Sequence, residues 1–143
     1  MRKISKEAAT KFVHYANFAQ NNTKVTQAPN GNTIMYLHGN RIASCHPTNG
    51  TWLSLAGWNT TTTRERLNGI MEVMGLTYRF RQIGGKAYIT CKERNVKIEI
   101  NEDNTYALDE IQTDLARFIH KPELPQIVGD LISDYEKEQN YDY

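Results

Sequence analysis

The sequence contains little cysteine and no long apolar run. The first argues against a disulfide-rich secreted protein and the second against a membrane-spanning protein. Only Cys45 and Cys91 are cysteines among 143 residues, whereas small secreted domains usually carry several disulfides. We therefore expect reduced thiols. No stretch approaches the roughly 18 apolar residues of a membrane-spanning helix, and the polar start has no apolar signal segment. We expect a cytoplasmic protein with one domain over residues 1–143, a length that suits a single core.

Acidic residues are scarce in the first two thirds of the chain and crowded into the last third. Residues 1–98 hold 14 Lys and Arg against 4 Asp and Glu, a net charge of +10. Residues 99–143 hold 3 Lys and Arg against 12 Asp and Glu, a net charge of −9. This asymmetry suggests a polyanionic partner for the basic part or a protein partner for the acidic part. Mutual attraction of the two parts within the fold explains it equally well.

Turn residues and apolar spacing predict an α+β fold in which an antiparallel sheet, a meander plus a hairpin, packs with helices. Asn30-Gly31, Gly39-Asn40 and Asn49-Gly50 each suit a two-residue hairpin turn, which requires positive φ. We expect the meander strands to span residues 23–27, 33–38, 41–46 and 51–56.

Four helices are predicted around this sheet. Apolar residues at helical spacing predict one from Ser5, as its cap, to about Gln20. A central helix opens with a capping box of Thr62 and Glu65 and ends at Gly75. Apolar stripes predict two C-terminal helices around residues 108–119 and 125–135, within an acidic helical part over 99–143 whose tail, 136–143, is expected to fray.

The second hairpin can be assigned a register. If Gly84-Gly85 forms its loop, counting outward pairs Arg81 with Tyr88 and Arg79 with Thr90. The opposite face then pairs apolar residues, among them Phe80 with Ile89. One face of the hairpin is therefore expected to be core and the other basic with an aromatic residue. Val96, Ile98 and Ile100 predict a further strand.

Several segments together resemble a known family. They are Leu37-His-Gly-Asn-Arg-Ile-Ala43, Leu53-Ser-Leu-Ala-Gly-Trp58 and Thr61-Thr-Thr-Arg-Glu-Arg-Leu-Asn68. This order resembles a family of small accessory proteins of tailed bacteriophages, over roughly residues 1–90. The resemblance implies a non-virion role inside an infected bacterium and supplies no catalytic residues.

Two groups of residues are candidates for binding nucleic acid or a nucleotide. The first is the start of the central helix, where free N–H groups, Thr61, Thr62, Arg64 and Arg66 suit a phosphate. A capped helix with two solvated arginines is the plainer interpretation. The second is the hairpin face, where arginines contact phosphates and a tyrosine stacks a base. Its residues are Arg79, Arg81, Tyr88, Lys92 and Lys97.

Metal binding and catalysis find weak support. Cys45, His46 and Cys91, with His38 or His120, lack the paired spacing of a zinc site, and adjacent Cys45 and His46 are poorly placed for nucleophilic catalysis. We expect no metal, no cofactor and no enzyme activity. Trp52 and Trp58 are expected to be half-buried packing residues rather than ligand platforms.

The sequence therefore predicts a phage accessory protein that acts by binding, with nucleic acid or a nucleotide as the first candidate ligand. The alternative is a protein inhibitor of a host enzyme or of an anti-phage defence complex, acting through acidic residues of the C-terminal part. The residues expected to contact such a partner are Asp130, Asp134 and Glu138.

Overall fold

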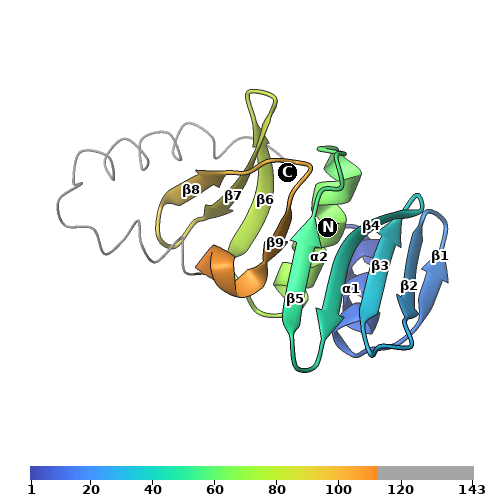
Figure 1. Ribbon diagram of the computed structural model, residues 1–143. Helices are drawn as coiled ribbons and strands as arrows, with labels where there is room; N and C mark the ends of the chain where they lie inside the picture. The colour runs from blue at the N-terminus through green and yellow to red at the C-terminus, as the bar shows by residue number, and fades with distance from the viewer. Residues whose placement is uncertain (113–143) are drawn as a thin grey trace.

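The computed structural model describes residues 1–112, which form the α+β fold that the sequence predicts (Figure 1). Strands β1–β5 and β9 make a six-stranded antiparallel sheet, and β6–β8 make a three-stranded one. A helical turn follows over residues 108–112. The elements are α1 (Lys3–Val13), β1 (Phe18–Gln20), β2 (Thr23–Gln27), β3 (Thr33–Leu37), β4 (Asn40–His46), β5 (Gly50–Ser54), α2 (Thr61–Val73), β6 (Tyr78–Ile83), β7 (Lys86–Cys91), β8 (Val96–Glu99) and β9 (Thr105–Ala107).

The predicted meander is confirmed as β2–β5, with strand ends within two residues of those expected. Gly31, Gly39 and Gly50 have φ between 79° and 91°, a conformation that costs glycine nothing. Only the turn between β3 and β4 has the predicted two residues, which are His38 and Gly39. The other two turns are longer, over residues 28–32 and 47–49. Strand β9 was not predicted, because residues 99–143 were expected to be helical. It pairs over three residues with β5, opposite Trp52, and such a short non-local pairing leaves no periodic signal.

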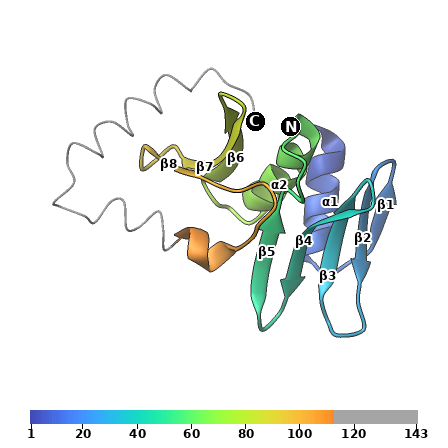
Figure 2. The same ribbon diagram turned by 45° about the horizontal axis from the view of Figure 1, so that its top comes forward.

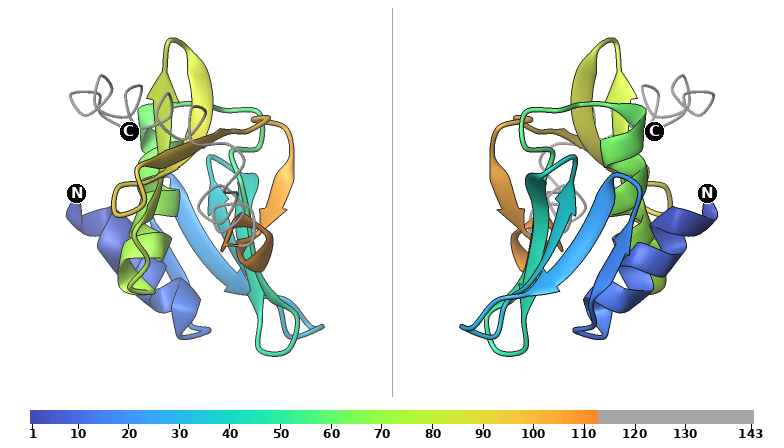
Figure 3. Two further views of the ribbon diagram at one scale, coloured as in Figure 1. Left: turned by 90° about the vertical axis from the view of Figure 1, so that its left-hand side faces the viewer. Right: turned by 90° about the vertical axis from the view of Figure 1, so that its right-hand side faces the viewer.

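Both helices lie side by side on one face of the six-stranded sheet (Figure 3). Helix α2 is central, since it contacts α1 on one side and β6 on the other (Figure 2). A single cluster of buried side chains joins the two sheets and the helices. It includes Phe12 of α1, Met35 of β3, Leu53 of β5, Ile70 of α2, and Phe80, Ile89 and Cys91 of the three-stranded sheet.

The N-terminal helix is shorter than predicted and does not use Ser5 as a cap. It begins at Lys3 and ends at Val13, because Tyr15 takes a positive φ of 55° and the Ala16 N–H bonds back to the Lys11 carbonyl. The chain then turns into β1, whose Phe18 pairs with Val25. Packing of Phe18 against the core outweighs the helical spacing on which the longer helix was predicted.

Helix α2 is capped by Thr60, two residues before the Thr62 of the predicted capping box. The Thr60 hydroxyl accepts the Thr63 N–H at 3.2 Å, whereas Glu65 is engaged by Arg2. Gly69 lies where α2 crosses α1. A methyl group there would come within 2.8 Å of the Ser5 carbonyl oxygen, so the glycine permits close approach of the helices despite its cost of about 1 kcal/mol to helix formation.

The first residues of the predicted C-terminal helix are helical, over 108–112, and Leu108 and Ile111 join the core cluster. The rest of that helix, the predicted helix 125–135 and the tail 136–143 lie outside the described residues. None of the helices within residues 1–112 is long and apolar enough to cross a membrane.

Candidate nucleic-acid interface

The three-stranded sheet presents a basic side, and its register is the one that the sequence predicts. Arg81 pairs with Tyr88 and Arg79 with Thr90 across β6 and β7, and Thr90 pairs with Lys97 of β8. Side chains alternate along a strand, so these residues share one side of the sheet. We call this side the basic face; its five ligand-binding candidates are Arg79, Arg81, Tyr88, Lys92 and Lys97.

The opposite side of the same sheet is held in the core. Phe80, Ile89 and Cys91 are buried there. Helix α2 also fixes the backbone of β6, because the buried Asn68 amide donates to the Phe80 carbonyl at 3.0 Å and accepts the Phe80 N–H at 2.7 Å. Asn68 thus takes the place of a neighbouring strand at the edge of the sheet. It holds β6 at Phe80, which lies between Arg79 and Arg81. Helical spacing alone did not indicate this role.

The guanidinium groups of the two arginines on the basic face are oriented by hydrogen bonds within the fold. Arg79 Nη1 donates to the Leu76 and Tyr78 carbonyls at 2.6 Å each. Arg81 Nε donates to Thr90 Oγ1 at 3.2 Å. Both side chains border a shallow hollow of about 490 Å³. The hollow is lined by Thr77, Arg79, Arg81, Thr90, Lys92 and Glu93.

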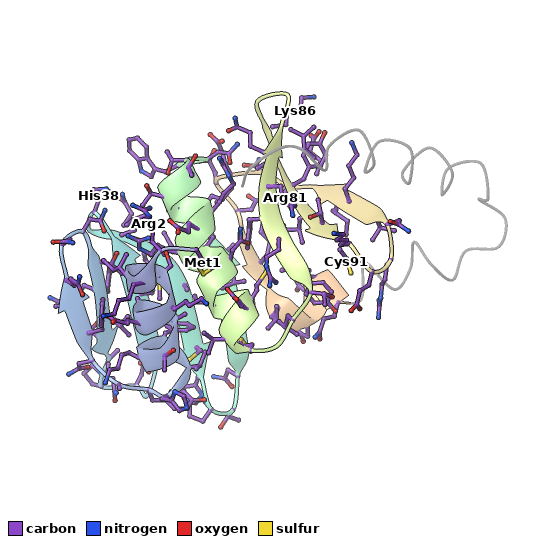
Figure 4. All side chains as sticks on the ribbon, turned by 180° about the vertical axis from the view of Figure 1, so that it is seen from behind. Met1, Arg2, His38, Arg81, Lys86 and Cys91 are labelled. Atoms are coloured by element: carbon purple, nitrogen blue, oxygen red, sulfur yellow. The ribbon has the colours of Figure 1, made fainter. Side chains whose placement is uncertain are left out.

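Tyr88 is placed differently from the expected base-stacking tyrosine. The Lys97 ammonium lies 4.8 Å from the centroid of its ring, so one face of the ring carries a cation. The Tyr88 hydroxyl donates to Glu99 at 3.4 Å, and Lys86 lies 3.8 Å from the same carboxylate oxygen. Figure 4 shows Lys86 at the tip of the hairpin and Arg81 on β6. The basic face therefore presents positive charge more than aromatic surface.

Arg64 and Arg66 are buried, so the plainer interpretation of two solvated arginines is wrong and neither guanidinium is exposed as an anion site would require. Their exposed fractions are only 3% and 1%. Arg66 donates from Nε to Thr23 Oγ1 at 2.9 Å and from Nη1 to Ser5 Oγ at 2.7 Å. Because Ser5 lies in α1 and Thr23 in β2, this arginine joins three elements that are distant in sequence.

Glu65 completes this buried cluster. Its carboxylate accepts the Arg2 backbone N–H and the Arg2 Nε–H at 2.6 Å each and lies 3.6 Å from Arg66 Nη1. Figure 4 shows Arg2 at the start of α1, beside α2. Burial alone would raise the pKa of Glu65, but these hydrogen bonds and the charges of Arg2 and Arg66 hold it below its usual range. Burial, followed by the nearby charge of Arg2, lowers the pKa of Arg66.

Arg64 points to the other side of α2. Its Nη1 donates to Asn59 and to Gln82 of β6, and its Nη2 to Thr61. Burial lowers the pKa of this guanidinium, and its Nε has no hydrogen-bond partner within the described part of the chain. Arg64 ties the start of α2 to β6 and is not available to a phosphate in solution.

The start of α2 still borders a cavity. A space of about 340 Å³ lies between this helix end and the turn from β3 to β4, with apolar Leu37 and Ile42 and polar Thr62 in its wall. Trp58 also lines it and is 57% exposed, so the expectation of a half-buried packing residue is wrong for Trp58. Thr61 lies outside this lining, and its hydroxyl accepts a hydrogen bond from Arg64.

The cysteines and histidines of residues 1–112 do not form a cluster. Cys45 and Cys91 are buried in the core, and burial raises the pKa of the Cys45 thiol, which donates to the Phe12 carbonyl. The His46 Nδ1 accepts the Thr48 N–H at 3.1 Å. Over residues 1–112, no three His, Cys, Asp or Glu side chains are grouped closely enough to hold a metal ion. His120 and the proposed partner-contact residues Asp130, Asp134 and Glu138 lie outside the described residues.

Comparison with known protein families gives a match over most of the chain. No curated protein and no solved structure matches the sequence significantly. The profile of the family described as Kyanoviridae Gp96 protein, a phage protein family, matches residues 1–110. This match extends past the roughly 90 residues over which a phage resemblance was expected, and it covers both sheets and both helices. The chain therefore belongs to the Kyanoviridae Gp96 family of phage proteins.

Proposed function

We propose that this protein binds nucleic acid through the basic face of the three-stranded sheet. The supporting observation is the pairing of β6, β7 and β8, which brings Arg79, Arg81 and Lys97 to one side of a sheet whose other side is core. Cations fixed on a rigid sheet lose little freedom on binding, and phosphate contacts supply most of the affinity for nucleic acid.

The local charge favours an anionic ligand. Glu99 is the carboxylate of β8, and it is held by Lys86 and the Tyr88 hydroxyl near the hairpin tip. The hollow near the other end of the hairpin is bordered by three cations, Arg79, Arg81 and Lys92, and by one carboxylate, Glu93. A phosphate that enters the hollow meets guanidinium and ammonium groups together with the Thr90 hydroxyl, a combination typical of backbone contacts.

The proposed role is accessory and non-catalytic, in the cytoplasm of an infected bacterium. Family membership supports the phage context. The buried Cys45 thiol, with its raised pKa, is a poor nucleophile. Binding needs no cofactor and no metal ion.

Fluorescence anisotropy with a labelled oligonucleotide, measured over a range of salt concentrations, tests the proposal. The double variant Arg79→Ala/Lys92→Ala should bind more weakly. The slope of log affinity against log salt should fall by about 0.7–0.9 for each phosphate contact that is lost. The control Lys3→Ala/Lys11→Ala removes the same charge from exposed positions of α1 and should change little. Equal affinity and slope for the wild type and Arg79→Ala/Lys92→Ala would contradict the proposal.

The alternative, an inhibitor of a host enzyme or defence complex, involves Asp130, Asp134 and Glu138. Its test is reversal of these three charges, followed by measurement of binding to any host protein that co-purifies near stoichiometrically after nuclease treatment. Unchanged binding would exclude the acidic residues as the contact surface.

A further inference from the structure

The six-stranded sheet has a second side, which faces away from α1 and α2 (Figure 3). Its residues follow from the strand pairing, because side chains alternate and the core residues Val25, Met35 and Leu53 mark the inner side. Ile34 is buried but stands outside the core cluster, which agrees with a position on the other side. We call this side the outer face; its exposed or half-exposed residues include Lys24, Tyr36, Arg41, Ser44 and Trp52.

Aromatic rings and cations alternate across the outer face. Tyr36 of β3 pairs with Lys24 of β2 on one side and with Arg41 of β4 on the other. Trp52 of β5 pairs with Ser44, which pairs with Ile34. Standard strand spacings then place Tyr36 and Trp52 roughly 12 Å apart. Trp52 is 39% exposed, which agrees with the half-buried position expected from the sequence.

Each ring borders a depression in this face. A groove of about 700 Å³ runs beside Tyr36, Lys24 and Thr26, and the turn between β1 and β2 also lines it. A smaller hollow of about 40 Å³ separates Arg41 from Trp52. A planar group of a ligand therefore has space in the groove beside Tyr36, whereas Trp52 offers an exposed ring beside a hollow too small for a base.

The charge of this region has one sign. No Asp or Glu occurs between Glu7 and Glu65, so the strands β1–β5 carry no carboxylate side chain. Lys24 and Arg41 are exposed, and neither forms an ion pair with another residue of the described part of the chain. A ligand complementary to the outer face is therefore an anion that also contains planar aromatic rings.

We propose that the outer face binds single-stranded nucleic acid, with bases stacked on Tyr36 and Trp52 and phosphates contacted by Lys24 and Arg41. Aromatic side chains that lie on an open sheet stack unpaired bases, whereas the bases of a duplex are already stacked on each other. The inference rests on the proposed function because it takes nucleic acid as the ligand, but it places the ligand on the outer face instead of the basic face. The basic face binds the phosphates of both single-stranded and double-stranded nucleic acid, whereas the outer face binds only the single strand.

Anisotropy measurements with a short oligothymidylate and with a duplex of equal length test this inference. Tyr36→Ala/Trp52→Ala should weaken binding to the single strand by about tenfold to a hundredfold and leave duplex binding unchanged. Tyr36→Phe keeps the ring and should bind like the wild type. A thermal melt of each variant verifies folding. As a second readout, Trp58→Phe leaves Trp52 as the sole tryptophan, and the oligothymidylate should quench its fluorescence.

The outcomes separate this inference from the proposed function. Loss of single-strand binding in Tyr36→Ala/Trp52→Ala, with Trp52 quenching in Trp58→Phe, supports the outer face even if Arg79→Ala/Lys92→Ala binds normally. Unchanged single-strand binding, or an equal loss for single strand and duplex, overturns it, even if the basic-face variant loses affinity for both. Self-association that Tyr36→Ala/Trp52→Ala abolishes, with no effect on nucleic acid, would assign the face to a second copy of the chain and also overturns it.

Discussion

Two arginine pairs in this protein, Arg64–Arg66 and Arg79–Arg81, have the same spacing in sequence and opposite surroundings in the fold. In a helix, residues two apart point about 200° away from each other, whereas in a strand they share a face. Helix α2 lies between α1 and β6, so both Arg64 and Arg66 are buried, on opposite sides. Strand β6 has one side in the core and one outside, so Arg79 and Arg81 share the outside. An Arg-x-Arg motif therefore indicates a binding surface only when the element that carries it is known.

The largest effect is expected from replacing Arg66, which tests whether the helical arginines stabilise the fold. Arg66→Ala removes the donors of the Ser5 and Thr23 hydroxyls and one of the two cations beside Glu65, which keeps only Arg2. We expect a loss of about 3–5 kcal/mol in the free energy of unfolding, measured by urea denaturation. Arg94→Ala, at an exposed turn position, is the control and should change stability by less than about 0.5 kcal/mol. Normal stability of Arg66→Ala combined with weaker nucleic-acid binding would reverse the assignment of the two pairs.

The crossing of α1 and α2, which buries Arg66, depends on Gly69. Gly69→Ala should destabilise the protein by about 1–3 kcal/mol, because the new methyl group meets the Ser5 carbonyl oxygen. The sign of the effect is informative. Without that contact, alanine would stabilise the helix by about 1 kcal/mol. Increased stability in thermal or urea unfolding would show that the helices do not approach this closely.

The buried cluster should also make stability depend on pH. The pKa of Glu65 is lower in the folded chain than its ordinary value of about 4.3, so its contribution is present above that pH. The contribution is lost as pH falls through the folded pKa, and each unit of lowering corresponds to about 1.4 kcal/mol. Urea denaturation below about pH 5 should show a steeper loss for the wild type than for Glu65→Gln. Parallel curves for the two proteins would show that Glu65 is not held by Arg2 and Arg66.

Removing a cation from the basic face should have the smallest effect on stability. Lys92→Ala should stay within about 0.5 kcal/mol of the wild type, because the side chain is exposed. Its salt slope for oligonucleotide binding should fall by about 0.7–0.9. Lys11→Ala, an exposed lysine of α1, should leave the slope unchanged. An equal change in both variants would show a diffuse charge effect instead of a defined face.

The parts of the fold that were predicted correctly have local causes. Gly84-Gly85 sets the turn of the hairpin, and the turn sets every pair in its register. Glycines with positive φ likewise lie at the turns of the meander, although only the turn between β3 and β4 has the predicted length of two residues. The basic face was therefore predicted residue by residue, including the pairing of Arg81 with Tyr88.

The parts that were missed depend on contacts between distant segments. Arg66 is buried by Ser5 and Thr23, which lie 61 and 43 residues away in sequence, and a helix start rich in Thr and Arg also fits a solvated end. Asn68 is a common surface residue whose bonds to Phe80 appear only once α2 and β6 meet. Tyr36 and Trp52 come together on the outer face only through the pairing of β3, β4 and β5.

The most direct test of the comparison is an NMR titration of the isotope-labelled protein with an oligonucleotide, observing the arginine side-chain Nε–H signals. Binding through the basic face should shift the Arg79 and Arg81 signals. The signals of Arg64 and Arg66 should stay in place, since both guanidiniums are buried and bonded within the fold. Shifts of Arg64 and Arg66, with Arg79 and Arg81 unmoved, would contradict the account and place the ligand at the start of α2.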